Sequence, residues 1–300
     1  MTRRIALLVN PTSGGGRGAR LLHPVAERLR RSDAEVDVVI GRDGDEAFDR
    51  LRDRLAEGLD GVVALGGDGL VNIALQVVGG TGVPLGVVPA GTGNDIARSL
   101  GLDPRDALAA ADLVALGHTR PVDLGRANGR WFAGVLGSGF DSMVNERANR
   151  MSWPSGRSRY NLAILAELRT FRPVPYVLDL DGERWETDAM LVAVGNGTSY
   201  GGGMRVCPGA SLDDGLLDLT VLGPISKPEF IRVFPTVYKG THVNHPAVTV
   251  RRARSVTLSA DGVTAYADGE RVSVLPVTCE AVPEGLLVYA PDTGGRGAST

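Results

Sequence analysis

The chain has 300 residues, of which 43% are hydrophobic, and its formal net charge is −3. This length allows two domains of ordinary size, and the apolar content excludes a disordered chain. A net charge so close to zero gives no reason to expect a nucleic-acid partner. The cysteines, Cys207 and Cys279, lie far apart, which favours a reduced, cytoplasmic setting over a disulfide-linked secreted domain. No apolar stretch approaches the ~18 residues of a membrane-spanning helix, so we expect any membrane contact to be peripheral.

The first part of the chain alternates strand-like and helix-like segments at the spacing of a parallel sheet. The strand-like segments are apolar runs without alternation, which indicates burial on both faces. The pattern predicts a three-layer α/β domain with a parallel sheet over residues 1–123. Strands are expected at 5–10, 36–40, 62–65 and 85–88, and helices at 19–31, 45–57, from 70 onward, 96–100 and 105–116.

Glycine-rich turns follow three of these strands directly, at residues 10–16, 66–69 and 91–95. Ligands of open α/β sheets bind at the carboxyl ends of the strands, which places the three turns along one edge. Glycine allows close approach of the backbone, and free N–H groups at a helix start attract phosphate. Asp68 lies within the second turn, where a carboxylate beside phosphates requires a cation or a transferable proton. The turns predict a phosphate site, and tight turns without a ligand are the alternative.

After residue 123 helical segments become sparse and strand-like runs dominate. Turn signals such as Asp181-Gly182 and Asp261-Gly262 separate these runs. The pattern is typical of an antiparallel β-sandwich or barrel, and it predicts a β-rich domain over residues 124–291. The Gly- and Ser-rich tail, 292–300, is expected to be disordered. Strands are expected at 131–135, 176–180, 190–194, 216–222, 247–250, 255–259, 272–276 and 286–289, and helices at 141–150, 159–170 and 227–233.

One segment of this second part is both basic and aromatic. Such a surface is suited to docking on anionic lipid, and a solvated helical face is the alternative. The segment contains Met151, Trp153 and Pro154 together with Arg147, Arg150, Arg157, Arg159, Arg169 and Arg172.

Short motifs occur in a defined order along the whole chain. They are Asn10-Pro11-Thr12-Ser13-Gly14, Gly66-Gly67-Asp68-Gly69, Val88-Pro89-Ala90-Gly91-Thr92-Gly93-Asn94-Asp95-Ile96-Ala97-Arg98, Val122-Asp123-Leu124, Gly137-Ser138-Gly139-Phe140-Asp141, Gly195-Asn196-Gly197, Asp214-Gly215-Leu216-Leu217-Asp218 and Ala267-Asp268-Gly269-Glu270. In this order and spacing the sequence resembles the diacylglycerol kinase catalytic-domain family, which includes bacterial lipid kinases and the sphingosine kinases. It is more distantly similar to NAD kinases and phosphofructokinases.

The resemblance implies an α/β nucleotide-binding domain and a β-rich lipid-substrate domain, with the active site in the cleft between them. It implies transfer of the γ-phosphoryl group of ATP to the hydroxyl of diacylglycerol or a similar lipid at a membrane surface, with Mg²⁺. Phosphoryl transfer needs backbone N–H groups and Mg²⁺ around the phosphates, and one carboxylate near the attacking hydroxyl. The glycine turns and the aspartates of the motifs are residues of the required types.

Roles carry over from the resemblance one position at a time. Asp268 matches the family's proton acceptor, with Gly269 and Glu270 on the substrate side. Asp68 and Asp95 would help to position the metal and the phosphates. The nucleotide would lie against Asn10, Pro11, Thr12, Ser13, Gly14, Gly66, Gly67, Asp68, Gly69, Asn72, Gly91, Thr92, Gly93, Asn94 and Asp95.

A separate structural magnesium site is also implied. Ser211, Asp214 and Leu216 match it, and Ser211 and Leu216 would serve through their backbone carbonyls. Oxygen ligands of this kind suit Mg²⁺. Without the resemblance, the Asp214-Gly215 and Asp268-Gly269 pairs are typical of simple turns.

The chain departs from the family pattern at two positions after the second glycine turn. Leu70 stands where the family usually has Thr, and Ile73 stands where it has Glu. One lost hydrogen bond to a charged group costs about 1.5–3 kcal/mol, which would weaken a kinase without abolishing it. Asp68, Asn72 and Asp268 remain in place. The role of Gly41 or Arg42, where a bacterial member would offer Thr near the adenosine, stays open.

Other functions remain open at this point. The acceptor could instead be a sphingoid base, another lipid or a small polar alcohol, because acceptor choice depends on the shape of a cavity. A nucleotide- or lipid-binding regulatory protein with little catalysis is a further alternative, which Leu70 and Ile73 support. The oligomeric state is open, and a homodimer through exposed strands of the second domain is one option.

Overall fold

The computed structural model describes residues 2–151, 153, 162–164, 166–167 and 172–291. The expected tail at 292–300 lies outside the described residues, and so does most of the expected helix at 159–170, of which the described residues are helical. The chain divides into two compact units, which we describe separately. The first unit is Met1–Val122 with the segment from Glu284 onward, and the second is Asp123–Pro283.

The first unit contains a parallel sheet with the strand order β2-β1-β3-β4. The end of β16 extends this sheet, since Val288 pairs in parallel with Leu85 of β4. The sequence placed residues up to 291 in the second domain, whereas this pairing brings the last segment back to the first unit. The elements are β1 (Arg3–Val9), α1 (Ser13–Arg30), β2 (Ala34–Val39), α2 (Gly44–Ala56), β3 (Gly61–Gly66), α3 (Asp68–Val78), β4 (Leu85–Pro89), α4 (Asp95–Ser99) and α5 (Ala107–Leu116).

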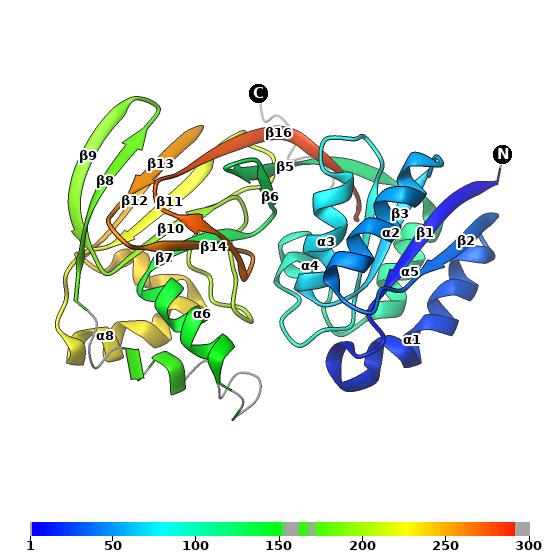
Figure 1. Ribbon diagram of the computed structural model, residues 1–300, viewed down its shortest axis with the longest axis horizontal. Helices are drawn as coiled ribbons and strands as arrows, with labels where there is room; N and C mark the ends of the chain where they lie inside the picture. The colour runs from blue at the N-terminus through cyan, green and yellow to red at the C-terminus, as the bar shows by residue number, and fades with distance from the viewer. Residues whose placement is uncertain (1, 152, 154–161, 165, 168–171, 292–300) are drawn as a thin grey trace, which may run out of the picture. The chain divides into compact units, whose positions relative to one another are not determined.

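Helices cover both faces of this sheet (Figure 1). Ile5, Leu7 and Val9 of β1 pack into one cluster with α1 and α5. Ala6 and Leu8 point to the opposite face, because side chains alternate along a strand, and they are also fully buried. On that face α2 and α3 pack together and contact β1 and β3. The predicted three-layer α/β arrangement is confirmed.

The second unit contains two antiparallel sheets. One has the order β12-β11-β10-β7-β14-β15, and the other joins the first half of β16 to β13, β8 and β9, with β5 and β6 alongside. The elements are β5 (Thr119–Ala127), β6 (Arg130–Phe132), β7 (Val135–Gly139), α6 (Phe140–Arg150), β8 (Val174–Leu180), β9 (Glu183–Ala189), β10 (Leu191–Gly195), β11 (Leu217–Leu222), α8 (Lys227–Val233), η1 (Phe234–Lys239), η2 (Thr241–Asn244), β12 (Val248–Ala253), β13 (Ser255–Ser259), β14 (Thr264–Ala267), β15 (Glu270–Val274) and β16 (Val277–Tyr289).

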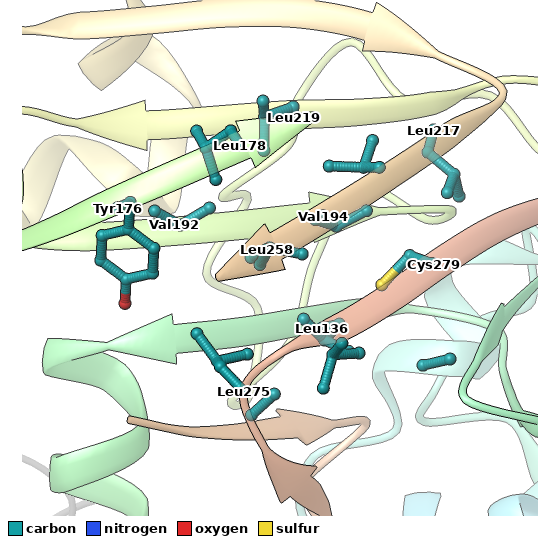
Figure 2. Close-up of a cluster of buried hydrophobic side chains, with 14 of the residues drawn as sticks. Leu136, Tyr176, Leu178, Val192, Val194, Leu217, Leu219, Leu258, Leu275 and Cys279 are labelled. Atoms are coloured by element: carbon teal, nitrogen blue, oxygen red, sulfur yellow. The ribbon is translucent and has the colours of Figure 1, made fainter. Parts of the chain in front are cut away.

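The two sheets of this unit share one apolar core. Leu136, Val192 and Val194 from the first sheet lie in the same buried cluster as Leu178 and Leu258 from the second (Figure 2). Burial of side chains between two antiparallel sheets defines a β-sandwich. The predicted sandwich is therefore confirmed, and the barrel alternative is not needed.

Helices cover the other face of the first sheet of the sandwich. Ala193 of β10 alternates with Val192 and Val194, and it packs with Met204 and Val237 in a separate cluster. The α6 and α8 helices pack through Phe140 and Phe230 in a neighbouring cluster. No helix in the part of the chain that the structure describes is long and apolar enough to cross a bilayer.

Candidate functional site

The three glycine turns lie at the carboxyl ends of β1, β3 and β4, which are neighbours in the parallel sheet. Parallel neighbours end at the same edge, so the fold brings the three turns together. The first turn is left-handed at Gly14, Gly15 and Gly16, with φ angles of 55°, 66° and 87°. Residues with a Cβ atom adopt this conformation at a cost. The glycines therefore set the path of the backbone before the regular part of α1 begins.

The first turn lies directly against the third. A Cβ atom on Gly14 would come within 2.2 Å of the Ala90 carbonyl oxygen, so only glycine fits there. A Cβ atom on Gly18 would come equally close to the Asn10 carbonyl oxygen. The Asn10 Oδ1 accepts hydrogen bonds from the Thr12 amide at 3.1 Å and from its hydroxyl at 2.8 Å. Asn10 thus fixes the start of the turn while the Thr12 side chain stays exposed.

The second and third turns are also in contact. A Cβ atom on Gly91 would lie 2.5 Å from the Gly67 Cα atom. The Ala90 amide donates to the Gly66 carbonyl at 2.8 Å. The Asn94 side chain holds both polar groups of Gly91, with distances of 3.0 Å to its nitrogen and 2.9 Å to its oxygen. The predicted nucleotide residues of this unit, at 10–14, 66–69, 72 and 91–95, are therefore grouped along one edge of the sheet, while their roles stay predictions.

Two acidic side chains lie within this group. The Asp68 Oδ1 accepts a hydrogen bond from the Ile96 amide at 3.1 Å, and Asp95 is buried beside it and paired with Arg98 at 3.0 Å. Burial, followed by the negative charge of Asp95, raises the pKa of the Asp68 carboxyl. A carboxylate that is both desolvated and next to another carboxylate is stabilised by a bound cation. The pair therefore fits Mg²⁺ that arrives with a nucleotide.

The two departures from the family pattern have packing roles. Leu70 is buried and lies over Gly66, where an added Cβ atom would come within 2.6 Å of its Cδ2 atom. The Ile73 Cδ1 atom lies at the start of α2, 3.4 Å from a Cβ atom placed on Gly44. Asn72 between them is buried, and its Nδ2 atom has no hydrogen-bond partner among the described residues.

The residues with the open role, Gly41 and Arg42, shape the start of α2. A Cβ atom on Gly41 would lie 2.4 Å from the Ala47 amide nitrogen. The partly buried Glu46 side chain accepts hydrogen bonds from the Arg42 amide and side chain at 2.7 and 2.9 Å, and these contacts lower the pKa of Glu46 to about 2. Local turn geometry accounts for both residues.

Asp268 lies in the β14–β15 turn of the second unit with a left-handed backbone, at φ 50°. Its carboxylate accepts hydrogen bonds from three successive backbone amides: Ala133 at 2.8 Å, Gly134 at 2.9 Å and Val135 at 3.2 Å. Charge-assisted bonds of this kind fix the orientation of the carboxylate. Gly134 must be glycine, since a Cβ atom there would lie 2.6 Å from the Asp268 Oδ1 atom. Gly269 and Glu270, predicted on the substrate side, are exposed next to it.

Asn196 is a residue of this site whose function the sequence did not reveal, although it stands within the Gly195-Asn196-Gly197 motif. Its Nδ2 donates to the Asp123 carbonyl and to the Ala133 carbonyl, each at 3.0 Å, and its amide donates to the Gly134 carbonyl at 2.9 Å. Asn196 thus holds the segment whose amides bind Asp268. The only sequence signal is an Asn between two glycines, and its role became visible with its complete burial in the structure.

The residues predicted to bind a structural magnesium lie in the turn before β11. Asp214 uses Oδ1 to accept the Leu216 amide at 3.1 Å, while its Oδ2 lies 3.8 Å from the Arg252 Nη1. The Ser211 hydroxyl bonds to the Asp213 carboxylate. Across the described residues, no group of three or more His, Cys, Asp or Glu side chains is arranged to hold a metal. The role of Ser211, Asp214 and Leu216 as ligands stays a prediction, and Arg252 is the cation near Asp214.

An apolar pocket lies between the helices and the sandwich of the second unit. Phe140 of α6 and Phe230 of α8 meet edge to face at 4.9 Å between ring centroids, and Phe234 stacks on Phe230 at 5.8 Å. The lining of this pocket is mostly apolar, and Tyr200, Thr220 and His242 are the lining residues with polar groups. The remaining lining residues are Val144, Ile164, Leu191, Tyr200, Met204, Val206, Leu222, Val233, Val237 and Val248.

Comparison with known proteins identifies the families that both units of the chain match. Residues 4–127 match the model of the diacylglycerol kinase catalytic domain, and residues 134–290 match that of the YegS C-terminal NAD kinase beta sandwich-like domain. A two-unit fold with these domains defines a kinase-type lipid phosphotransferase. A diacylglycerol kinase from Mycobacterium tuberculosis (strain CDC 1551 / Oshkosh) is 45% identical over 297 residues, which cover 97% of this chain and 96% of the relative.

Two further relatives agree with this match. A diacylglycerol kinase from Bacillus subtilis (strain 168) is 30% identical over 281 residues, covering 91% of this chain and 92% of the relative. The crystal structure of a Bacillus anthracis str. Sterne protein, described as a candidate diacylglycerol kinase, superposes with a TM-score of 0.79 at 26% identity, covering 97% and 96% of the two chains. The chain belongs to the diacylglycerol kinase family.

Proposed function

We propose that the protein transfers the γ-phosphoryl group of ATP to the hydroxyl of diacylglycerol or a similarly apolar lipid, in a Mg²⁺-dependent reaction. The apolar pocket of the second unit is the observation that favours a lipid as the acceptor. A small polar alcohol would find few hydrogen-bonding partners in this pocket. A long acyl chain, by contrast, gains about 0.8 kcal/mol for each CH₂ group that it buries. The relatives named diacylglycerol kinase support the same substrate class.

The first unit binds the nucleotide in this proposal. Its glycine turns present backbone N–H groups to the phosphates, and the left-handed path at Gly14 to Gly16 keeps side chains out of the way. Asp68 and Asp95 hold the metal ion that accompanies ATP. Burial and the charge of Asp95 make the ionised form of Asp68 unfavourable, and a bound cation would offset both effects, which supports this role. Bound Mg²⁺ supplies charge neutralisation at the transferred phosphate.

Asp268 accepts the proton of the acceptor hydroxyl as the new O–P bond forms and the bond to the ADP leaving group breaks. The products are the lipid phosphate and ADP. Phosphoryl transfer has a loose transition state, so a positioned carboxylate is sufficient as the proton acceptor. Three backbone amides hold the Asp268 carboxylate in one orientation, which supports this positioning role.

The pocket and Asp268 belong to the same layer of the sandwich. β7 begins at Val135, the last residue of the segment 133–135 that binds Asp268, and it ends at Gly139, next to Phe140 of α6, which lines the pocket. The Ser199 carbonyl lies 3.4 Å from a Cβ atom placed on Gly134, and the next residue, Tyr200, lines the pocket as well. A lipid with its chain in the pocket can therefore direct its hydroxyl towards Asp268.

Transfer of labelled γ-phosphate from Mg-ATP to dispersed diacylglycerol tests the reaction. Wild-type protein should label the organic phase, and Asp268→Asn should reduce this rate by about 10²- to 10⁴-fold, the range for loss of a general base. Asp261→Asn is the matched control, because Asp261 is an exposed aspartate of another Asp-Gly turn in the same unit. Equal rates in wild type and Asp268→Asn would refute the assigned proton acceptor.

The acceptor class is tested by a panel of long-chain diacylglycerol, short-chain diacylglycerol, a sphingoid base and glycerol. A bulky residue in the pocket, Val233→Trp, should raise KM for the long-chain lipid and leave short-chain acceptors unaffected. Ile231→Trp on the same helix is the control, since Ile231 is 55% exposed. Phosphorylation of glycerol alone would reject the lipid assignment, and binding of ATP and lipid without turnover would favour a regulatory protein.

A further inference from the structure

The turn before β11 surrounds one guanidinium group with oxygen atoms. Arg252 of β12 lies directly opposite Asp218 of β11 in the antiparallel ladder. Its Nε atom is 3.3 Å from the Asp218 Oδ2, and its Nη2 donates to the Gly209 carbonyl at 2.8 Å. The Nη1 atom lies 3.8 Å from the Asp214 Oδ2. Arg252 therefore bonds to one carbonyl of the turn and lies near two carboxylates, that of Asp214 in the turn and that of Asp218 in β11.

Burial makes these contacts necessary. The Asp218 residue is only 1% exposed, and a carboxylate so far from water needs a cation nearby. Asp218 lies opposite the half-exposed Arg252, whose Nε donates to the Asp218 Oδ1 at 3.4 Å, while the buried Oδ2 has no hydrogen-bond partner among the described residues and faces Arg252 only as an ion pair at 3.3 Å. In antiparallel sheets, opposite charges at facing positions stabilise the pair of strands.

The same turn is tied to the segment that precedes the sandwich. The Gly215 amide donates to the Asp123 Oδ2 at 2.7 Å, and the Asp123 amide donates to the Leu212 carbonyl at 2.7 Å. The Asp123 carbonyl in turn accepts from Asn196, which also holds the Ala133 carbonyl. The chain of hydrogen bonds thus runs from the turn that Arg252 holds to the amides that bind Asp268.

The oxygen atoms around Arg252 have the chemistry of a divalent-cation site. Carboxylates and backbone carbonyls are the ligands of Mg²⁺ and Ca²⁺, and the family resemblance implied such a site at this turn. The Asp214 carboxylate is already committed, because one oxygen caps the Leu216 amide and the other faces Arg252. A fixed positive charge among these oxygens opposes the entry of a second cation. The residues present therefore do not fit a bound metal while Arg252 stands there.

We propose that Arg252 is the resident cation of this turn and takes the place of a structural metal ion. Arg252 neutralises Asp218 and Asp214, keeps the turn at 209–216 closed on Asp123, and acts as a positioning residue for the segment that binds Asp268. On this proposal Ser211, Asp214 and Leu216 do not bind magnesium, because the side chain at position 252 supplies the positive charge of the turn. This inference concerns the second unit and does not rest on the proposed substrate.

The test compares wild type, Arg252→Ala and Arg251→Ala without nucleotide, with and without MgCl₂ or CaCl₂. Arg251 is the matched control, since it lies on the same strand but pairs with Glu183 and stacks on Trp185, away from the turn. Thermal unfolding reports stability, and hydrogen exchange at the Gly215 and Leu216 amides reports the turn itself. Neither readout depends on catalysis.

We expect the wild-type turn to be protected from exchange equally with and without metal. Arg252→Ala should lower Tm by about 5–10 °C, because it leaves a buried carboxylate unpaired, and should expose the two amides to exchange. Divalent metal should restore about 3 °C of Tm and part of the protection in Arg252→Ala only. Arg251→Ala should show no effect on the two amides.

Other results would overturn the inference. Metal-dependent protection of the wild-type turn that disappears in Asp214→Asn would show a metal site and refute Arg252 as its replacement. Full protection in Arg252→Ala without metal would show that Arg252 is not needed. Loss of protection that no divalent cation restores would refute the idea that Arg252 stands in the place of a metal. If Arg252→Ala does not fold, Arg252→Lys is tested in its place. We expect the Gly215 and Leu216 amides of Arg252→Lys to be protected from exchange without metal. Protection that requires a divalent metal in this variant would contradict the proposal.

Discussion

The glycine turns of the first unit and the Asp268 site of the second are constructed in different ways. Each glycine turn is one contiguous stretch that follows a buried strand, and the three come together because parallel neighbours end at the same edge. The Asp268 site gathers residues 123, 133–135, 196 and 268 from four places in the chain. Each turn of the first site is encoded by one short stretch of sequence, whereas the second site depends on which strands of the sandwich are neighbours.

This difference also appears in what holds each site rigid. In the first unit the backbones of neighbouring turns are in direct contact, and this contact is possible because Gly14 and Gly91 have no side chain. In the second unit specific side chains, Asp268 and Asn196, bind backbone groups of distant strands. Added atoms should therefore damage the first site, and removed hydrogen bonds should damage the second.

Gly14→Ala tests the first half of that comparison and should have the largest effect. The added Cβ atom would meet the Ala90 carbonyl oxygen at 2.2 Å, and the φ angle of 55° adds strain, so the first turn must move away from the third. We expect ATP affinity to fall by about 100-fold, equivalent to about 2.7 kcal/mol. Equilibrium binding of an ATP analogue measures the loss.

Gly15→Ala is the matched control for this effect. Gly15 has a similar φ angle of 66°, but no atom lies within 4 Å of an added Cβ. It should therefore show only the cost of the left-handed backbone, about 1 kcal/mol of stability. Equal losses of ATP affinity in the two variants would show that backbone conformation, and not the contact with Ala90, governs the turn.

Asn196→Asp tests the second half of the comparison. The variant keeps the shape of the side chain but removes the donor that two carbonyls share, so the segment at 133–135 and its hold on Asp268 should loosen. We expect kcat to fall by about 10- to 100-fold while the affinity for ATP stays unchanged. Steady-state kinetics together with ATP binding separate the two effects.

The control is Asn128→Asp at the β5–β6 turn of the same unit. The Asn128 Oδ1 accepts the Thr278 amide at 3.1 Å, and Asp can keep this bond. Asn128→Asp should retain wild-type kcat. A fall in ATP affinity for Asn196→Asp would contradict a role confined to the second unit.

The same contrast explains how much the sequence could predict. Strands β1, β3 and β4 and their glycine turns were expected almost where they lie, because buried parallel strands are apolar runs with a clear end. β9 was not expected, since Glu183–Ala189 is a mostly polar edge strand, and neither was β14, which is only four residues long. Edge position and shortness remove the periodicity on which such predictions depend.

The candidate sites follow the same rule. The sequence predicted the glycine turns and Asp268 through motifs, but not the amides of 133–135 that bind it, because any residue supplies an N–H group. Arg252 could not be assigned to Asp218 either, since their pairing depends on the β11–β12 register. The regular part of α1 was expected from residue 19, and the structure places it close to there, because Gly14, Gly15 and Gly16 have left-handed, non-helical backbone angles although the element is delimited from Ser13.

Leu70→Thr compared with Leu70→Val tests whether the first site is weakened by its departure from the family pattern. Both variants remove buried apolar volume above Gly66 and should lower stability by about 1–2 kcal/mol. They differ in one hydroxyl group, which in the family position would bond to phosphate at about 1.5–3 kcal/mol. We expect Leu70→Thr to transfer phosphate about tenfold faster than Leu70→Val. Equal rates would show that position 70 does not contact the nucleotide.

The smallest expected effect distinguishes a buried histidine of the second unit from an exposed one of the first. His242 lines the apolar pocket, and burial lowers its pKa, while a contact at 3.1 Å to the Val206 carbonyl partly opposes this. The folded state therefore holds His242 neutral in a range where the unfolded chain binds a proton. Its contribution to stability is complete above the ordinary histidine pKa of about 6.5 and is lost as the pH falls through the lower folded-state value.

Replacing His242 by Gln should therefore flatten the acid side of the stability profile. Urea unfolding of wild type at several pH values from 7.5 downward should show a lower midpoint at acid pH, and His242→Gln should show less of this decline. His23→Gln is the control, because His23 is exposed on α1 and its replacement should leave the profile unchanged. If the decline persisted in His242→Gln, the pocket would not be the origin of the pH dependence, and the second unit would tolerate a charged group where the apolar lining of its pocket argues against one.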